Sequence, residues 1–525
     1  MTCIISTFGL LDWSALAAYM LIVVAIGLIA GRKQHDMSSF FLSSRSMPTW
    51  AVALSILATT LSAATFIGVP EITFAGDLSY LILNIGGVLA AIFVAAIFIP
   101  VLYHAGTITI YGYLDKRFGP PSAIAASLFF LFGRLLASGA RLFIAGIAFS
   151  FMLFNDINIQ YLVSAIVILG IIGTLYTACG GIRAVIWTDV AQIIIVVGAA
   201  IFSIFLLIDL IPLSIPQIID TLSNTGGQNK LRVLNTSFNP FDSNNTYTLW
   251  AGFAVIFINT AALGADHDIT QRMLTTRSAW KGSLSLIISN LLSIPVVLLF
   301  MIIGLLLYIY YGMPEVMGAA APVEDADDAR KIFPMFLLHH MPPGLAGLAM
   351  AGLFAAAMSS FDSAVNAMSA SFVADLYLPM KKLRDCVEDE PHTDRSLQYS
   401  RIAVVVIGLL LTLFAVVAAY FQQSGGQKLI DFSLGIMAFA YAGLLGVFLT
   451  AILTNRGNNT SAIIALIAGA MIVLIMQPYI MKPLTTWLCN QPYQLTWPWW
   501  MVIATPTCFI ICALPPNIHS KMNSG

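Results

Sequence analysis

Apolar segments long enough to cross a membrane recur along nearly the whole chain, and they restrict its possible folds more than any other feature. A helix of about 20 apolar residues spans the hydrocarbon layer, because its backbone polar groups must find their partners inside the segment. Only 9% of the 525 residues are charged, and 59% belong to the hydrophobic set. Soluble domains carry about 25% charged residues, so this composition excludes a soluble globular protein.

We predict an all-α polytopic membrane protein, because thirteen segments have the length and apolar character of a membrane span. Several of these segments are interrupted by glycine or proline. They cover residues 11–31, 49–75, 79–104, 121–153, 158–178, 183–212, 247–270, 279–311, 343–378, 399–422, 429–454, 460–477 and 496–515.

The distribution of lysine and arginine predicts which side of the membrane each end of the chain occupies. With an outer N-terminus, the cytoplasmic loops hold sixteen of these residues and the outer loops six, while Arg134 and Arg141 lie inside the membrane. In this count Arg272 is assigned to a cytoplasmic loop. Because cytoplasmic loops carry the excess of positive charge, we expect an outer N-terminus and a cytoplasmic C-terminus in the inner or plasma membrane.

Charge and motifs also exclude several classes of function. The net charge of −1 gives no reason to expect a nucleic-acid partner. The six cysteines are scattered without a CxxC pair, and no nucleotide-binding or metalloprotease motif is present. We therefore expect no enzymatic activity, and the expected partners are the lipid bilayer and a small-molecule substrate.

Hydroxyl residues crowd the second segment immediately before Gly68 and Pro70. They are Thr59, Thr60, Ser62 and Thr65. Small and hydroxyl residues next to a glycine–proline break predict a discontinuous helix, whose freed carbonyls and hydroxyls can coordinate a hard cation. The alternative is close helix packing through small residues, with hydroxyls bonded back one turn.

A second polar cluster surrounds Asp362 in the ninth segment. Its other members are Ser359, Ser360, Ser363 and Asn366. Residues three and four positions apart share a helix face, and a carboxylate with hydroxyls suits an oxygen-seeking cation such as Na⁺. A charge at this depth costs roughly 2.5–3.5 kcal/mol on insertion scales. The alternative is therefore a structural role in which Asp362 pairs with an arginine.

Three further ionisable residues are expected at bilayer depth. Asp189 lies about two turns inside the sixth segment, where it can join the ninth-segment cluster or act as a solvated cap. Arg134 and Arg141 are seven residues apart and project from nearly the same face of the fourth segment. Either arginine can hold a substrate carboxylate or form an internal ion pair with an acid such as Asp189.

The chain resembles the sodium/solute symporter family, whose members have a leucine-transporter-type fold. The resemblance covers nearly the full length, and its motifs are most similar to those of the bacterial sialic acid transporter branch. It depends on Ser62-Ala-Ala-Thr-Phe-Ile-Gly-Val-Pro70, Gly180-Gly-Ile-Arg-Ala-Val-Ile-Trp-Thr-Asp189, Gln271-Arg272, Ser359-Ser-Phe-Asp-Ser363 with Asn366, and Asp375-Leu-Tyr377.

The family fold implies a single transporter domain over residues 1–525, built from a 5+5 inverted repeat. Residues 49–212 and 247–454 would form the two repeats of five helices, each with a discontinuous first helix. Residues 10–31 would form a peripheral first helix, and residues 460–515 two peripheral C-terminal helices. We expect the protein to function as a monomer.

The resemblance also implies a site for one sodium ion, and some members of the family bind a second. At the first site, carried over by position, the carbonyls of Ala58, Leu61 and Ala356 act with the hydroxyls of Ser359 and Ser360. At the second site the matching positions are Asp189, Ser359, Asp362 and Ser363. Asp362 stands where the two-sodium sialic acid transporters carry serine, so a proton could replace the second ion there.

The substrate positions implied by the sialic acid branch lie on the second to fourth segments. They are Thr60, Ser62, Thr65 and Arg141, with Tyr80 and Asn84 as flanking candidates. Asn84 departs from the glutamine that is expected there. The sugar branch instead carries Ser-Ala-Glu-Gln and Asn-Gln at positions that are here Ser62-Ala-Ala-Thr65 and Asp266-His267.

The sequence therefore predicts a sodium-coupled symporter that imports a small organic solute by alternating access. The expected solute carries a carboxylate, as sialic acid does. The alternatives are a neutral sugar, an amino acid, a monocarboxylate or a vitamin as solute, or a proton-coupled carrier of the same fold. A channel-like signalling protein is a further alternative.

Overall fold

The computed structural model describes residues 9–31, 37–154, 156–224, 229–242, 246–318, 329–385, 394–422 and 429–515. Every regular secondary-structure element in these ranges is a helix, which confirms the predicted all-α class. Eight helical segments in the same ranges are long and apolar enough to cross a membrane, and two bent helix pairs bring the number to ten. The chain is therefore an all-helical membrane protein.

Each predicted segment overlaps one of these helical segments or one of three shorter apolar helices. The eight long segments are Leu10–Gly27, Leu78–Ala105, Pro120–Phe151, Gly181–Leu210, Ala279–Gly312, Leu345–Lys381, Gln398–Tyr420 and Asn459–Met476. The bent pairs are Thr49–Thr60 with Thr65–Ala75 and Leu249–Ala265 with His267–Leu274, and the shorter helices are Ile159–Leu175, Met437–Leu453 and Trp497–Ala513.

The elements that build the centre of the bundle are α3 and α4, α8, α9, α13, α14 and α17. Their bounds are α3 Thr49–Thr60, α4 Ala63–Ala75, α8 Pro120–Phe154, α9 Ile159–Leu210, α13 His267–Leu274, α14 Ala279–Gly312 and α17 Leu345–Ser371. The long element α9 covers two predicted segments, joined at Gly181, whose φ of 56° is outside the helical region. Glycine populates positive φ without the steric cost of a Cβ atom, so it suits this junction.

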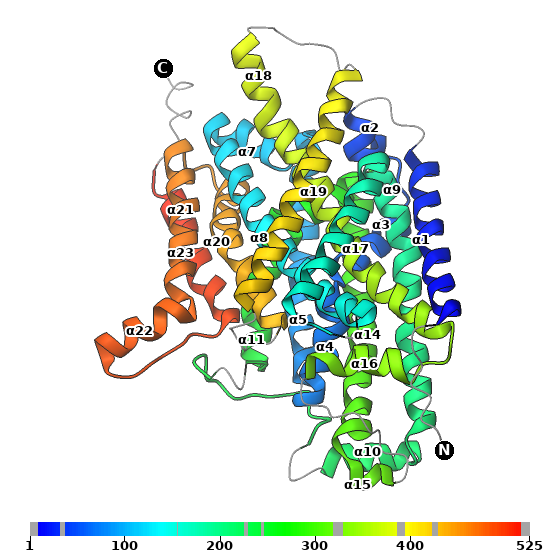
Figure 1. The fold of residues 1–525 in the computed structure, drawn as a ribbon. Coiled ribbons are helices and arrows are strands. Elements are labelled where there is room, and N and C mark those ends of the chain that lie inside the picture. Colours follow the sequence, from blue (N-terminus) through cyan, green and yellow to red (C-terminus); the bar gives the residue numbers. More distant parts are fainter. Residues whose placement is uncertain are drawn as a thin grey trace, which may run out of the picture.

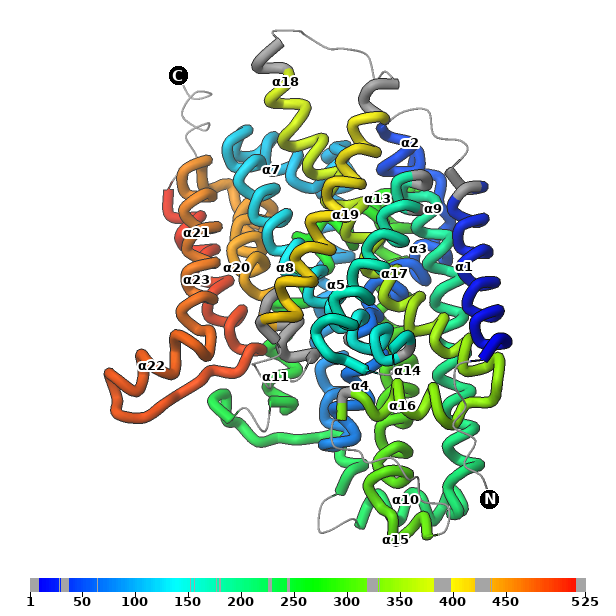
Figure 2. The backbone as a smooth tube through the Cα atoms, viewed as in Figure 1, coloured from blue at the N-terminus to red at the C-terminus, as the bar shows by residue number. Residues whose placement is uncertain are grey.

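Figure 1 shows α1 (Leu10–Gly31) along one edge of the bundle, and α21 (Asn459–Met476) and α23 (Trp500–Ala513) along the opposite edge. The first helix packs on α9 and α17, whereas α21 and α23 pack on α20 (Leu429–Leu453). Figure 2 shows α18 (Leu378–Asp385) at one end of the bundle and α10 (Ile215–Asn224) at the other.

The break that the sequence predicts in the second segment is present, but its position differs from the prediction. Gly68 and Pro70 lie inside α4, and the chain leaves the helix at Leu61 and Ser62, which adopt extended backbone angles. Because Ser62 accepts hydrogen bonds from the N–H groups of Thr65 and Phe66 through its carbonyl oxygen, it starts the new helix. The helix axis bends by 57° between the two arms, Thr49–Thr60 and Thr65–Ala75.

A second break separates the arms of the seventh predicted segment. Here α11 (Leu249–Ala254), α12 (Ile256–Thr260) and the π-helix η6 (Ala261–Ala265) lead to Asp266, which is extended and precedes α13. The helix axis bends by 53° between the two arms. The Asp266 carboxylate accepts a hydrogen bond of 2.8 Å from the N–H of Asp268 and so caps α13.

Small residues set the closest helix contacts, as in other membrane bundles where helices approach through glycine. A methyl group added to Gly443 on α20 would lie 2.7 Å from the Cα atom of Leu466 on α21. This distance leaves no room for a side chain. We infer that glycine at this position allows α21 to dock against α20.

We predict that Gly443→Ala lowers the free energy of unfolding by about 1–3 kcal/mol, the usual cost of overpacking. Thermal unfolding of the purified protein in detergent measures the change. Gly198→Ala on α9 is the matched control, because nothing lies within 4 Å of its added methyl group. Equal melting temperatures for the two variants would contradict this packing.

Candidate functional site

A cavity of about 210 Å³ lies beside the break between α3 and α4. Five of the six predicted substrate residues line it, and they come from α3, α4, η2 (Leu78–Ile82), α5 (Leu83–Phe93) and α8. The five are Thr60, Thr65, Tyr80, Asn84 and Arg141. Ser62, the sixth, is buried at the helix break and is not part of the lining.

The two arginines of α8 both line the cavity, but they have different partners. The Arg134 guanidinium forms ion pairs with Asp266, at 3.1 Å, and with Asp268. The Arg141 guanidinium is 3.1 Å from the sulfur of Met437 on α20 and has no ion pair within the described residues. Arg141 is therefore the guanidinium that is available to an anion in the cavity.

One of the residues predicted for the first sodium site, Ser360, contacts the end of α3 beside the helix break. Ser360 on α17 donates a hydrogen bond of 3.2 Å from its hydroxyl to the carbonyl oxygen of Thr59, the second-last residue of α3. The last four carbonyls of a helix have no N–H partner within that helix; Ala58 belongs to this last turn of α3, and Leu61 follows it directly. Ala356 and Ser359 lie one turn or less before Ser360, and both are buried.

Ser359 connects this junction to the buried carboxylate of Asp189. Its hydroxyl donates a hydrogen bond of 2.6 Å to Oδ1 of Asp189 on α9, and the Ser55 hydroxyl on α3 donates one of 2.5 Å to Oδ2. Asp189 is fully buried. The structure thus places it with the ninth-segment cluster, and the alternative of a solvated helix cap is wrong.

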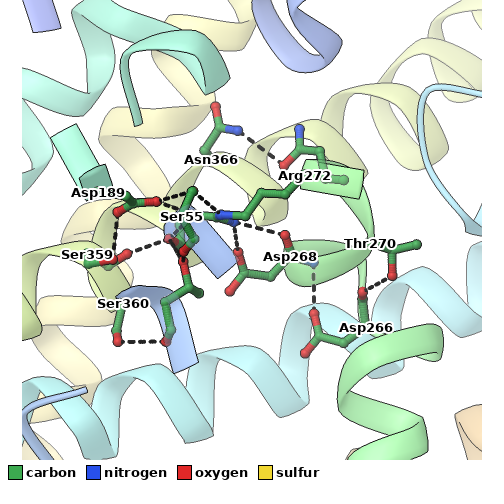
Figure 3. A network of polar contacts seen from close by, with 12 residues as sticks. Ser55, Asp189, Asp266, Asp268, Thr270, Arg272, Ser359, Ser360 and Asn366 are labelled. Atoms are coloured by element: carbon green, nitrogen blue, oxygen red, sulfur yellow. Dashed lines mark hydrogen bonds and ion pairs between the residues drawn. The ribbon is translucent and has the colours of Figure 1, made fainter. Parts of the chain in front are cut away.

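Arg272 lies at the centre of the polar network in Figure 3, between two aspartates. Its Nη2 atom is 3.2 Å from Oδ2 of Asp189, and its Nη1 atom is 2.7 Å from Oδ1 of Asp268. The Nε atom donates to the Ser55 hydroxyl at 2.9 Å, and Nη2 also donates to the Ser363 hydroxyl. Asp268 in turn pairs with Arg134, so one chain of charges runs from α9 through α13 to α8.

Arg272 is not a loop residue, because it lies on α13 and its side chain is fully buried in this network. The alternative in which Asp189 pairs with Arg134 or Arg141 is wrong, since Arg272 is its partner. Tyr441 on α20 completes the network by donating a hydrogen bond to Asp266. In the sequence, Arg272 was marked only by the Gln271-Arg272 motif. Its contacts with Asp189 and Ser55 could not be predicted, because these residues lie far away along the chain.

The four residues predicted for a second sodium site do not face a common point. Asp189 and Ser359 are in contact, but Ser363 bonds to Arg272 and to the carbonyl oxygen of Ser359. Asp362 turns instead toward Thr177 on α9, whose hydroxyl donates to Oδ1 at 2.9 Å. The other carboxylate oxygen of Asp362 is buried without a hydrogen-bond partner, and no arginine pairs with it within the described residues.

Several polar lining residues were not singled out by the sequence, among them Asn259 on α12 and Ser289 and Asn290 on α14. Single asparagines in apolar helices are common enough that spacing alone does not mark them. Their place in the cavity depends on how α12 and α14 pack against α5. That packing involves residues far apart in the sequence.

A helical bundle with broken helices beside a cavity that contains a few polar side chains has the architecture of a membrane transporter. The family model described as "Sodium:solute symporter family" matches residues 40–469 of the chain. The protein therefore belongs to the sodium:solute symporter family, and it is a transporter, not an enzyme.

Curated relatives and solved structures agree with this membership. The sodium/sialic acid symporter NanT of Aliivibrio fischeri is 27% identical over 470 residues, which cover 89% of this chain and 88% of that protein. The human sodium-coupled monocarboxylate transporter 1 is 28% identical over 475 residues, 90% of this chain and 73% of the relative. The structure of a Na⁺-coupled sialic acid symporter in a substrate-bound outward-open state has a TM-score of 0.79 at 23% identity, covering 97% of this chain and 98% of the other.

We predict that Asp268→Asn lowers the free energy of unfolding by about 3–5 kcal/mol, because it leaves two buried guanidiniums without their shared carboxylate. Thermal unfolding in detergent measures the loss. Asp77→Asn is the matched control, since Asp77 pairs with Arg232, whose side chain is 53% exposed, and such a pair contributes under about 1 kcal/mol. Equal destabilisation by the two variants would contradict a structural role for the network.

Proposed function

We propose that the protein is a sodium-coupled secondary active symporter that imports a small carboxylated solute by alternating access, with sialic acid as the leading candidate. The observation that carries this proposal is the junction between α3, α4 and α17. There the Ser360 hydroxyl contacts the open end of α3, beside a cavity lined by Arg141, whose guanidinium has no ion pair among the described residues. Family membership supports the same function.

The first sodium ion, in this proposal, binds to the carbonyls of Ala58, Leu61 and Ala356 and to the hydroxyls of Ser359 and Ser360. All five donors are oxygen atoms, which a hard cation prefers. A serine hydroxyl that donates its hydrogen to a neighbour keeps two lone pairs for a cation. The hydrogen bonds of Ser359 to Asp189 and of Ser360 to Thr59 are therefore compatible with this role.

Electrostatics also favour a cation at this junction. The neighbouring network contains three carboxylates, Asp189, Asp266 and Asp268, and two guanidiniums, Arg134 and Arg272. When all five are ionised, the network carries one excess negative charge among buried side chains. A monovalent cation beside Asp189 would neutralise it, which lowers the cost of burying these groups.

A second sodium ion at Asp189, Ser359, Asp362 and Ser363 would require two local changes. Asp362 would have to turn away from Thr177, and Ser363 would have to release Arg272. We therefore propose one sodium ion at the first site. A second sodium ion, or a proton carried by Asp362, is the alternative.

The solute carboxylate is proposed to bind to Arg141, with Thr60, Thr65, Tyr80 and Asn84 lining the same cavity. Arg134 is already neutralised by two aspartates, so it attracts an anion less strongly. A monocarboxylate or a vitamin is the second candidate solute, because a monocarboxylate transporter is as similar in sequence as the sialic acid symporter.

The membrane topology completes the proposal. Thirteen spans would include repeats at residues 49–212 and 247–454, with an outer N-terminus, a cytoplasmic C-terminus and activity as a monomer. The bent first helix in each proposed repeat supports this arrangement. The repeats would rock about the central cavity, and each inward sodium ion would add about 2.3 kcal/mol per 100 mV of membrane potential to the driving force.

We predict that uptake into proteoliposomes requires sodium and stops when choline replaces it. Ser360→Ala should raise the sodium concentration for half-maximal uptake about tenfold, because it removes one ligand and the contact with Thr59. Ser164→Ala is the matched control, since this exposed serine bonds back to the carbonyl of Gln160 and lies outside the site. Uptake that is equally fast in choline would reject sodium coupling.

We predict that Arg141→Gln raises KM for the carboxylated solute about 10- to 100-fold, as expected for the loss of a hydrogen bond to a charged group. Initial rates of sodium-driven uptake give KM. The matched control is Lys482→Gln, which also removes a cation but lies on the exposed surface of α22 (Pro478–Cys489). An unchanged KM in Arg141→Gln would place the solute carboxylate elsewhere.

A further inference from the structure

The cavity has a second group of polar side chains on helices other than the one that carries Arg141. Arg141 lies on α8, and its guanidinium contacts Met437 on α20. Asn259 on α12 and Asn290 on α14 also line the cavity, together with Gly87 on α5. Both α12 and α14 pack against α5. The lining therefore combines the Arg141 guanidinium with carboxamides from three helices, those of Asn84 on α5, Asn259 and Asn290.

Gly87 leaves an open space between the carboxamides of Asn259 and Asn290. A methyl group added to Gly87 would lie 3.6 Å from Oδ1 of Asn290 and 4.0 Å from Nδ2 of Asn259. One acceptor and one donor thus border the same space, and no side chain occupies it. The neighbouring Gly86 differs, because its added methyl group would lie 2.3 Å from the carbonyl oxygen of Gly252. Gly86 is needed for packing, whereas Gly87 is not.

The orientation of the Asn290 carboxamide is set by its own helix. Its Nδ2 atom donates a hydrogen bond of 3.0 Å to the carbonyl oxygen of Leu286, one turn earlier. This bond uses one N–H of the Asn290 carboxamide, so its acceptor atom Oδ1 faces Gly87. Both Asn259 and Asn290 are half-buried, so a ligand that displaces water there must replace the hydrogen bonds that water made.

We propose that Gly87, Asn259 and Asn290 form a specificity subsite for a hydroxyl or carboxamide group of the solute, apart from the carboxylate that Arg141 binds. A hydroxyl can donate to Oδ1 of Asn290 and accept from Nδ2 of Asn259, and a secondary amide can do the same with its N–H and C=O. This inference rests on the proposed function, in which Arg141 binds the carboxylate. It predicts that the protein binds hydroxylated or N-acylated organic acids in preference to simple alkanoates.

Selection at such a subsite depends on the cost of leaving polar groups unpaired. An alkanoate would displace water from the two carboxamides and offer them no hydrogen bond. Sites that are built to bond a substrate hydroxyl or N–H group discriminate strongly against analogues that lack it. One lost hydrogen bond of about 1.4 kcal/mol corresponds to a tenfold change in affinity.

Gly87→Ala tests the subsite in the full-length protein. Its methyl group makes ordinary contacts and fills the space, so the fold is retained. The probes are N-acetylneuraminate, gluconate and hexanoate, which differ in hydroxyl and amide groups but all carry a carboxylate. Binding is measured by thermal shift with and without sodium, and by competition in sodium-driven uptake. Gly198→Ala is again the matched glycine control.

The expected result is that wild-type protein binds at least one hydroxylated acid about tenfold more tightly than hexanoate. Gly87→Ala should lower the affinity for that acid about tenfold and leave the affinity for hexanoate unchanged. Asn259→Ala and Asn290→Ala should reduce the same preference, and they keep the test decisive should Gly87→Ala fail to fold. Loss of affinity for all three acids alike, or for none, would overturn the subsite.

The two proposals fail in different ways. Wild-type protein that binds none of the acids in a sodium-dependent manner overturns the proposed function and the subsite with it. Sodium-dependent binding of the acids, with equal preference in wild-type and variant proteins, overturns the subsite alone. Loss of N-acetylneuraminate binding with retention of gluconate in Gly87→Ala supports the subsite and identifies the N-acyl group as its ligand.

Discussion

The centre of this bundle depends on the pairing of buried charges. A carboxylate or guanidinium inside a membrane protein carries a large desolvation cost, which is offset when an opposite charge lies within hydrogen-bonding distance. Here Arg272 connects Asp189 to Asp268, and Asp268 connects onward to Arg134. These four residues belong to α9, α13 and α8, so the positions of three helices follow from one set of ion pairs. The serines of α3 and α17 are held in the same network.

The helices themselves could be predicted from composition and hydropathy, because a span must satisfy its backbone within its own segment. The exact position of the first break could not. Gly68 and Pro70 look like the stronger helix breakers, yet both lie inside α4, and the chain breaks at Leu61 and Ser62. Since the end of α3 is held by Ser360 on another helix, tertiary contacts override local propensity at this position.

The candidate site could be predicted where its residues stand out in an apolar background. Hydroxyl clusters and arginines at bilayer depth meet that condition, and Thr60, Thr65 and Arg141 do line one cavity. Arg272 did not stand out, because it follows a span and reads as a loop residue. The direction of the Asp362 side chain could not be predicted either, since residues three and four positions apart on one helix can still face different neighbouring helices. Such directions depend on packing between distant segments.

The end of α3 belongs to two sites at once, and this has an energetic consequence. The Thr59 carbonyl accepts a hydrogen bond from Ser360 at the proposed cation junction, while Thr59 also lines the cavity that is proposed to bind the solute. In the proposed cycle, the two occupants therefore share one structural element. Any factor by which sodium raises the affinity for solute must equal the factor by which solute raises the affinity for sodium. A carrier without solute would then hold sodium weakly, which limits futile dissipation of the ion gradient.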